Sequence, residues 1–219
     1  MLSIDIIQNI FPIKNGKKTG TCFAINHGAN QYLITAKHII NNINTGDCLE
    51  FLFSGIHTRA NVKIIGHHPT ADISIFTIDH DTGLTGLEYY TNKIKPGQEA
   101  YFIGFPTGTG SRKSNKHPKK YPQARIKKAT ISEIIHSDTD NYLLLNGKIN
   151  PGFSGGPVIL KDSSEKKFKV IAIISGSKRS KESVQHKEKV KPISLRNRTG
   201  ITLAYSVGNV VERMRGENG

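Results

Sequence analysis

The chain has 219 residues, 36% of them hydrophobic, and a formal net charge of +14. A chain of this length can bury one or two cores. No segment approaches the roughly 18 apolar residues of a membrane span, and the N-terminus lacks a basic region followed by a long apolar run. We therefore expect a soluble, cytoplasmic protein with no signal peptide and no membrane contact.

The positive charge is concentrated in two windows. Residues 111–128 carry eight Lys/Arg and no acid, and residues 178–198 carry eight Lys/Arg against two Glu. These windows contribute +8 and +6, which is the whole excess, so the rest of the chain is neutral. The pattern predicts two basic loops on a neutral scaffold. They either recruit an acidic protein or nucleic acid, or merely keep two long loops solvated.

The cysteines and histidines give no metal-binding pattern. Cys22 and Cys48 could form one disulfide, but without an export signal free thiols are favoured. Neither cysteine lies in a CxxC or His-rich setting. His67 and His68 are adjacent, and neighbours in a strand point to opposite faces. No metal and no cofactor are expected.

Short apolar segments separated by polar turns run through the first part of the chain. Residues 4–13 are compatible with a strand or a short helix. Strands are predicted over residues 20–26, 31–36, 49–53, 58–65 and 72–78. Since no long helical period appears, the pattern indicates an antiparallel β-barrel or sandwich.

The pattern loosens between about residues 80 and 92, and a second set of strands follows. We place a domain boundary here, giving domains 1–85 and 86–219. Strands are predicted over residues 99–105, 129–137, 141–145, 158–161, 169–175 and 200–207. A helix is predicted over about 207–215, because its apolar residues recur at spacings of three and four.

Ser154 lies in the run Asn-Pro-Gly-Phe-Ser-Gly-Gly-Pro-Val, residues 150–158. Glycines beside a serine let backbone N–H groups turn toward a common point. Such a run fits a nucleophile beside an oxyanion pocket, or simply a turn between two strands. A base and an orienting acid elsewhere in the chain would favour the nucleophile over the turn. His38 is the candidate base and Asp72 the candidate acid, and each lies at a predicted strand.

Three motifs follow one another along the chain. Residues 33–39 resemble a strand ending in T-x-x-H, and residues 71–76 resemble D-[IL]-A-[VL]-L. Residues 149–157 resemble I-N-P-G-N-S-G-G-P nearly throughout. With weaker matches at residues 101–108 and 200–207, the chain resembles the trypsin-like (chymotrypsin-fold) serine peptidases, closest to the peptidase domain of the bacterial high-temperature-requirement proteases. The resemblance implies an all-β protein of two six-stranded antiparallel β-barrels with a short C-terminal helix.

The resemblance also implies roles. His38 would be the general base, Asp72 its orienting carboxylate and Ser154 the nucleophile, with the N–H groups of Gly152 and Ser154 forming the oxyanion hole. The first barrel would carry His38 and Asp72, and the second Ser154. The implied function is a regulated or substrate-restricted serine endopeptidase acting on a protein through an acyl-enzyme. The alternative is a catalytically idle binding module that uses its basic loops.

Two features depart from the family pattern or leave it open. Phe153 stands where trypsins carry an aspartate that pairs with a newly cut N-terminus, so trypsin-style activation is not expected. Either Phe153 packs into the second barrel and the hole is preformed, or a partner orders it. Lys148 occupies the position of the pocket-floor acid in trypsins, where it would favour acidic side chains or point to solvent. Ser175, Gly176 and Ser177 are expected to line the pocket wall, and cleavage after Arg or Lys is not expected.

Overall fold

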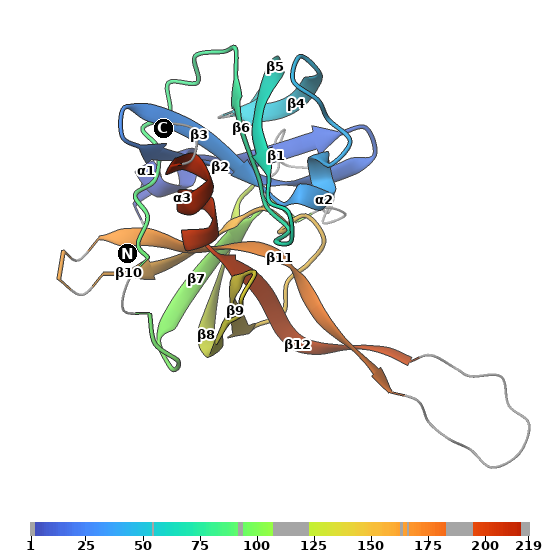
Figure 1. Ribbon diagram of the computed structural model, residues 1–219, viewed down its shortest axis with the longest axis vertical. Helices are drawn as coiled ribbons and strands as arrows, with labels where there is room; N and C mark the ends of the chain where they lie inside the picture. Colours follow the sequence, from blue (N-terminus) through green and yellow to red (C-terminus); the bar gives the residue numbers. More distant parts are fainter. Residues whose placement is uncertain are drawn as a thin grey trace, which may run out of the picture.

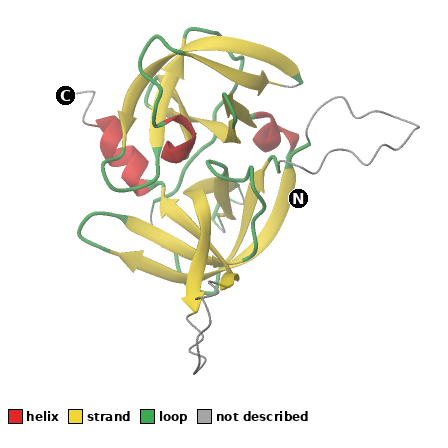
Figure 2. Ribbon diagram, turned by 90° about the vertical axis from the view of Figure 1, so that its right-hand side faces the viewer, coloured by secondary structure: helices red, strands yellow, loops and turns green. Residues whose placement is uncertain are grey.

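The computed structural model describes residues 3–53, 55–91, 94–106, 123–162, 164–165, 167–182 and 195–215. Two closed antiparallel barrels stack on each other, as Figures 1 and 2 show. This architecture confirms the predicted fold class. No helix within the described ranges is long and apolar enough to cross a membrane.

The first barrel contains six strands in the order β1-β2-β3-β6-β5-β4. Their bounds are β1 (Ile10–Asn15), β2 (Lys18–His27), β3 (Asn30–Thr35), β4 (Cys48–Phe53), β5 (Ile56–His67) and β6 (Ser74–Ile78). Pairing of β1 with β4 closes the barrel. Its centre holds apolar side chains from all six strands, including Phe11, Cys22, Leu33, Phe51, Val62 and Phe76.

The second barrel repeats this topology. Its strands are β7 (Glu99–Gly104), β8 (Arg125–His136), β9 (Asn141–Asn146), β10 (Pro157–Lys161), β11 (Phe168–Glu182) and β12 (Leu195–Ser206). The order around the barrel is β10-β11-β12-β9-β8-β7, which is the order of the first barrel when its own strands are counted from one to six. Pairing of β10 with β7 closes it.

A separate apolar cluster lies between the two barrels, and the C-terminal helix packs into it. It joins Phe23 and Ile34 of the first barrel to Ile103 and Ile173 of the second. The helix α3 (Gly208–Arg215) begins one residue after the predicted start. As the spacing predicted, its apolar face is buried in this cluster through Val210, Val211 and Met214, together with Val207 just before the helix.

The connection between the barrels touches both of them. It runs from the end of β6 to the start of β7 and forms one bridge to each barrel, Ile25 with Leu87 and Tyr89 with Val170. The domain boundary expected at residues 85–86 falls in this connection and stays a prediction.

One short helix and one strand boundary differ from expectation. Residues 4–13 form both of the expected alternatives, α1 (Ile4–Gln8) followed by β1. The helix α2 (Lys37–Ile40) was not predicted, because four residues are too short for a helical period to show. β6 begins at Ser74, so Asp72 precedes the strand that it was expected to open.

The expected basic loops are partly strand. β11 continues to Glu182 and pairs with β12 from Leu195, forming a ribbon that projects from the barrel in Figure 1. The prediction of a loop over all of residues 178–198 is therefore wrong at both ends, where the chain forms strands. The last four residues of the window 111–128 likewise lie in β8. Residues 107–122 and 183–194, which hold the rest of these windows, lie outside the described residues.

Candidate active site

His38 and Asp72 meet on the first barrel. His38 lies in α2, just after β3, and Asp72 in the segment that joins β5 to β6. The backbone N–H of His38 donates to Asp72 Oδ1 at 2.8 Å, and His38 Nδ1 lies 2.7 Å from Asp72 Oδ2. An ionised carboxylate only accepts hydrogen bonds, so the proton of the neutral imidazole is on Nδ1. Nε2 is then free to accept a proton.

The environment of Asp72 keeps it ionised. Burial alone would raise its pKa, but hydrogen bonds from His38 and Ser175 outweigh burial and hold the pKa of Asp72 below its usual value. Its side chain is only 19% exposed, whereas that of His38 is 48% exposed. The pair therefore combines a partly buried carboxylate with a ring that solvent or a substrate can reach.

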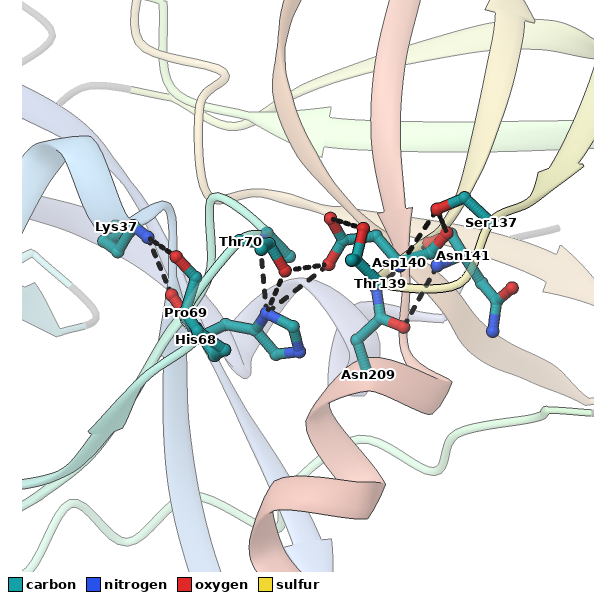
Figure 3. Close-up of polar contacts among 10 residues, drawn as sticks. Lys37, His68, Pro69, Thr70, Ser137, Thr139, Asp140, Asn141 and Asn209 are labelled. Carbon is teal, nitrogen blue, oxygen red and sulfur yellow. Dashed lines mark hydrogen bonds and ion pairs between the residues drawn. The ribbon is translucent and has the colours of Figure 1, made fainter.

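Lys37 ties the helix of His38 to the segment of Asp72. Its ammonium donates to the carbonyls of His68 at 2.7 Å and Pro69 at 3.2 Å, as Figure 3 shows. Within the same segment, the backbone N–H of Ala71 donates to His68 Nδ1 at 3.0 Å. These contacts fix the backbone immediately before Asp72.

The second barrel holds the same segment from the other side. Thr70 Oγ1 donates to Asp140 Oδ1 at 2.7 Å, and His68 Nδ1 lies 3.5 Å from the same oxygen (Figure 3). Asp140 directly precedes β9, and Asn209 of α3 donates to the neighbouring carbonyl of Asn141 at 3.0 Å. The acid-bearing segment is therefore braced by both barrels. Sequence reasoning did not find Lys37, Thr70 or Asp140, since no local pattern marks them.

The turn of Ser154 belongs to the second barrel but is held by the first. Thr21 Oγ1 donates to the carbonyl of Gly152 at 2.7 Å, and the N–H of Thr21 donates to the carbonyl of Ser154 at 2.8 Å. Gly155 has φ +84°, and a Cβ there would lie 2.2 Å from the carbonyl oxygen of Thr21. Only glycine fits this contact between the barrels.

Residues 150–153 form a turn that leaves two N–H groups available. The N–H of Phe153 donates to the carbonyl of Asn150 at 3.2 Å, and Gly152 has φ +98°. With Pro151 as the second residue, these are the features of a type II turn. In the described part of the chain, neither Gly152 N–H nor Ser154 N–H donates to a protein acceptor. Two free donors beside a hydroxyl are what an oxyanion hole requires.

Ser175 links the nucleophile turn to the His–Asp pair. Its hydroxyl donates to Asp72 Oδ2 at 2.6 Å, and its carbonyl accepts from Ser154 Oγ at 3.0 Å. The Ser154 hydroxyl is thus directed at Ser175 and makes no hydrogen bond to His38 within the described residues. Nucleophile–base hydrogen bonds are often formed only when substrate binds. The sequence predicted Ser175 as a pocket wall residue and gave no sign of its contact with Asp72.

The other expected pocket residues are placed only in part. Lys148 is exposed, and its carbonyl accepts a hydrogen bond from Lys127 Nζ at 2.6 Å. Among the described residues, a Cβ added at Gly176 would meet no atom within 4 Å. The side chain of Ser177 lies outside the described residues. The pocket roles of Lys148, Ser175, Gly176 and Ser177 stay predictions. Within the ranges given above, no three His, Cys, Asp or Glu side chains are arranged to hold a metal.

Two six-stranded antiparallel barrels, with a serine in a glycine turn linked to a His–Asp pair where they meet, define the trypsin-like class. The family model described as "Trypsin-like peptidase domain" matches residues 20–173. The chain therefore belongs to the trypsin-like peptidase domain family.

The chain is also similar to one curated relative. A "Probable periplasmic serine endoprotease DegP-like" of Marinomonas sp. (strain MWYL1) is 26% identical over 159 residues, 69% of this chain and 29% of the relative. The chain thus spans less than a third of that protein's length.

Solved structures with low sequence identity share the fold. The active form of the Rv3671c protease from M. tuberculosis has a TM-score of 0.64 at 15% identity, covering 96% of this chain and 81% of that one. An HtrA-type protease, AlgW with a tripeptide, has a TM-score of 0.66 at 18% identity, covering 97% and 60%. A serine endoprotease from Yersinia pestis has a TM-score of 0.62 at 17% identity, covering 97% and 63%. At these identities the likeness shows the fold.

Proposed function

We propose that the chain is a serine endopeptidase that hydrolyses peptide bonds of a protein substrate through an acyl-enzyme. The observation that carries the proposal is the hydrogen bond of Asp72 to Nδ1 of His38, which leaves Nε2 free to accept a proton. Family membership and the glycine turn of Ser154 support it.

In this mechanism His38 Nε2 accepts the Ser154 proton as Oγ attacks the substrate carbonyl. The negative charge that develops on the carbonyl oxygen is stabilised by Gly152 N–H and Ser154 N–H. His38 then gives its proton to the leaving amine, and a water molecule, activated by the same imidazole, hydrolyses the acyl-enzyme. Asp72 stays ionised and stabilises the imidazolium in both steps.

A fluorophosphonate probe tests this proposal, because it reacts only with an activated serine. We expect the wild type to be labelled at neutral pH and the Ser154→Ala variant to remain unlabelled. His38→Ala should lose several powers of ten in labelling rate. A wild type that resists the probe with every protein partner tried would instead support the idle binding module. The Ser154–Ser175 hydrogen bond is the observation that keeps this alternative open.

We further propose that activity is restricted by an anionic partner, either an acidic protein or nucleic acid, at windows 111–128 and 178–198. Three of the cations of the first window are described, and two have intramolecular partners. Lys127 binds Lys148 and Asn150, and Lys128 pairs with Glu99. Recruitment must therefore rest mainly on the other cations of the windows.

Salt dependence tests this recruitment. Raising the salt from 50 to 200 mM should weaken cleavage of the native substrate, or partner affinity, at least about tenfold if several cations engage one polyanion. Labelling by the small neutral probe should change little over the same range. If the native substrate also shows no salt dependence, the windows do not recruit it.

We also propose a cytoplasmic location. Cys22 is buried and Cys48 exposed, and neither forms a disulfide. An exposed free thiol fits a reducing compartment. The Marinomonas relative is named as periplasmic, so cell fractionation is the measurement that separates the two compartments.

A further inference from the structure

Phe153, the last residue of the turn at residues 150–153, is completely buried. Its ring packs against Phe102 of β7 with centroids 5.9 Å apart and planes at 85°. A Cβ at Gly104 would lie 2.7 Å from the Phe153 ring, so the ring rests directly on the backbone of β7. The side chain is thus fixed in the core of the second barrel and has no charge with which to bind an N-terminal ammonium.

Lys127 supplies an ammonium at the same place. It lies on β8, opposite Phe102 in the ladder, and its Nζ is 5.4 Å from the centroid of the Phe153 ring. A cation within about 6 Å of an aromatic ring centroid is attracted by the ring face. The contact joins a side-chain cation to Phe153, which stands where trypsins carry an aspartate.

The same ammonium holds the backbone on the N-terminal side of the turn. Lys127 Nζ donates to the Lys148 carbonyl at 2.6 Å and to Asn150 Oδ1 at 3.0 Å. Asn150 and Phe153 are the first and last residues of the type II turn, so Lys127 contacts both of its ends. One flexible side chain therefore fixes the segment from 148 to 153 at three points.

The turn type decides whether the oxyanion hole exists. Types I and II differ by a flip of the central peptide, here the bond between Pro151 and Gly152. In type II the Gly152 N–H can donate to a substrate oxygen. After the flip, the Pro151 carbonyl would point to the place where that oxygen would lie. Gly152, with φ +98°, favours type II, and the contacts of Lys127 hold the segment that carries this turn in place.

We propose that Lys127 is a positioning residue that holds the oxyanion hole open from within the chain, with no need for a new N-terminus. The inference rests on the proposed peptidase function. It deepens that function by selecting the preformed site over one ordered by a partner.

Three variants test Lys127 with the fluorophosphonate probe. Lys127→Met removes the charge but keeps the length of the side chain. Lys127→Arg keeps the charge, and Lys128→Met is a matched control on the neighbouring residue, which is exposed and paired with Glu99. The dependence of labelling rate on probe concentration separates the maximal rate from the affinity of the probe.

For Lys127→Met we expect the maximal labelling rate to fall about 10-fold to 100-fold with affinity within about twofold, because a misplaced oxyanion donor affects the transition state alone. Lys127→Arg should retain most of the rate, and Lys128→Met should match the wild type. Equal rates in Lys127→Met and Lys128→Met would overturn the proposal. If Lys127→Met does not fold, Asn150→Ala decides, with a reduced maximal rate expected and an unchanged rate contradicting the proposal.

The pH profile adds a readout that a purely structural lysine would not change. Burial, and the nearby charges of Arg125 and Lys148, lower the pKa of Lys127. The ammonium should therefore lose its proton below the ordinary lysine range, and the labelling rate should fall as pH rises through that pKa. In Lys127→Arg this loss should move to higher pH, because a guanidinium stays charged. A wild type that never reacts refutes the proposed function, whereas a reactive wild type with unaffected Lys127 variants refutes only this inference.

Discussion

At the scale of single residues, the site depends on one carboxylate that receives three hydrogen bonds. Asp72 accepts from the N–H and Nδ1 of His38 and from the hydroxyl of Ser175. The motifs around His38 and Asp72 indicated this partnership, because both resemble motifs of the trypsin-like peptidases. The bond from Ser175 could not be predicted, because it joins positions 103 residues apart through the closure of the second barrel.

Replacing Asp72 should change activity and the response to acid together. Asp72→Asn should lower the labelling rate by about 10⁴, because the amide favours the wrong imidazole tautomer. The pKa of Asp72 is lower in the folded chain than the ordinary value of about 3.9, so its contribution to stability is complete above that value and is lost as pH falls through the folded pKa.

Urea unfolding of the wild type and Asp72→Asn at a series of pH values measures this contribution. The difference in unfolding free energy should be largest near neutral pH and should shrink as the pH falls below about 4. A difference that stays constant from pH 7 to pH 3 would show that Asp72 is not stabilised as an anion by the folded site.

At the scale of elements, the segment before Asp72 is held by its neighbours on two barrels. α2 reaches it through Lys37, and the turn before β9 reaches it through Asp140 (Figure 3). The Asp140 side chain is 12% exposed and accepts the Thr70 hydroxyl at 2.7 Å. This junction links the position of the acid to the packing of the second barrel.

Asp140→Ala should therefore destabilise the protein and slow labelling. The change removes the acceptor of the Thr70 hydroxyl and the carboxylate beside His68, and should lower the free energy of unfolding by about 1 kcal/mol. Asp138→Ala, at an exposed position of the same turn, is the matched control and should stay within about 0.5 kcal/mol of the wild type. Equal stability of the two variants would mean that the junction does not support the site.

Element prediction succeeded where a strand faces a core and failed where it does not. β3 and β9 coincide with short apolar segments of the sequence, because each contains a run of buried residues. The ribbon of β11 and β12 beyond Ser177 projects from the barrel in Figure 1, so no core imposes an apolar alternation on its sequence. Its Lys/Arg-rich composition therefore indicated a loop. α2 was missed for a different reason, its length of four residues.

At the scale of the whole molecule, the candidate site exists because two repeated barrels close against each other. Thr21 of the first barrel donates to the Gly152 carbonyl, 131 residues away. The Thr35 hydroxyl in turn donates to the Thr21 carbonyl. Local motifs revealed the three candidate catalytic residues because each carries its own signature. Lys127 and Asp140 carry none, since their importance comes from contacts that exist only after both barrels have formed.

The most direct test of the central claim is to locate the fluorophosphonate adduct by mass spectrometry after digestion of labelled wild-type protein. The mechanism predicts one adduct per chain, on Ser154 within the glycine turn, and its loss in both Ser154→Ala and His38→Ala. An adduct on another serine, or undiminished labelling of Ser154 in His38→Ala, would contradict the assignment of His38 and Asp72 as the base and acid that activate Ser154.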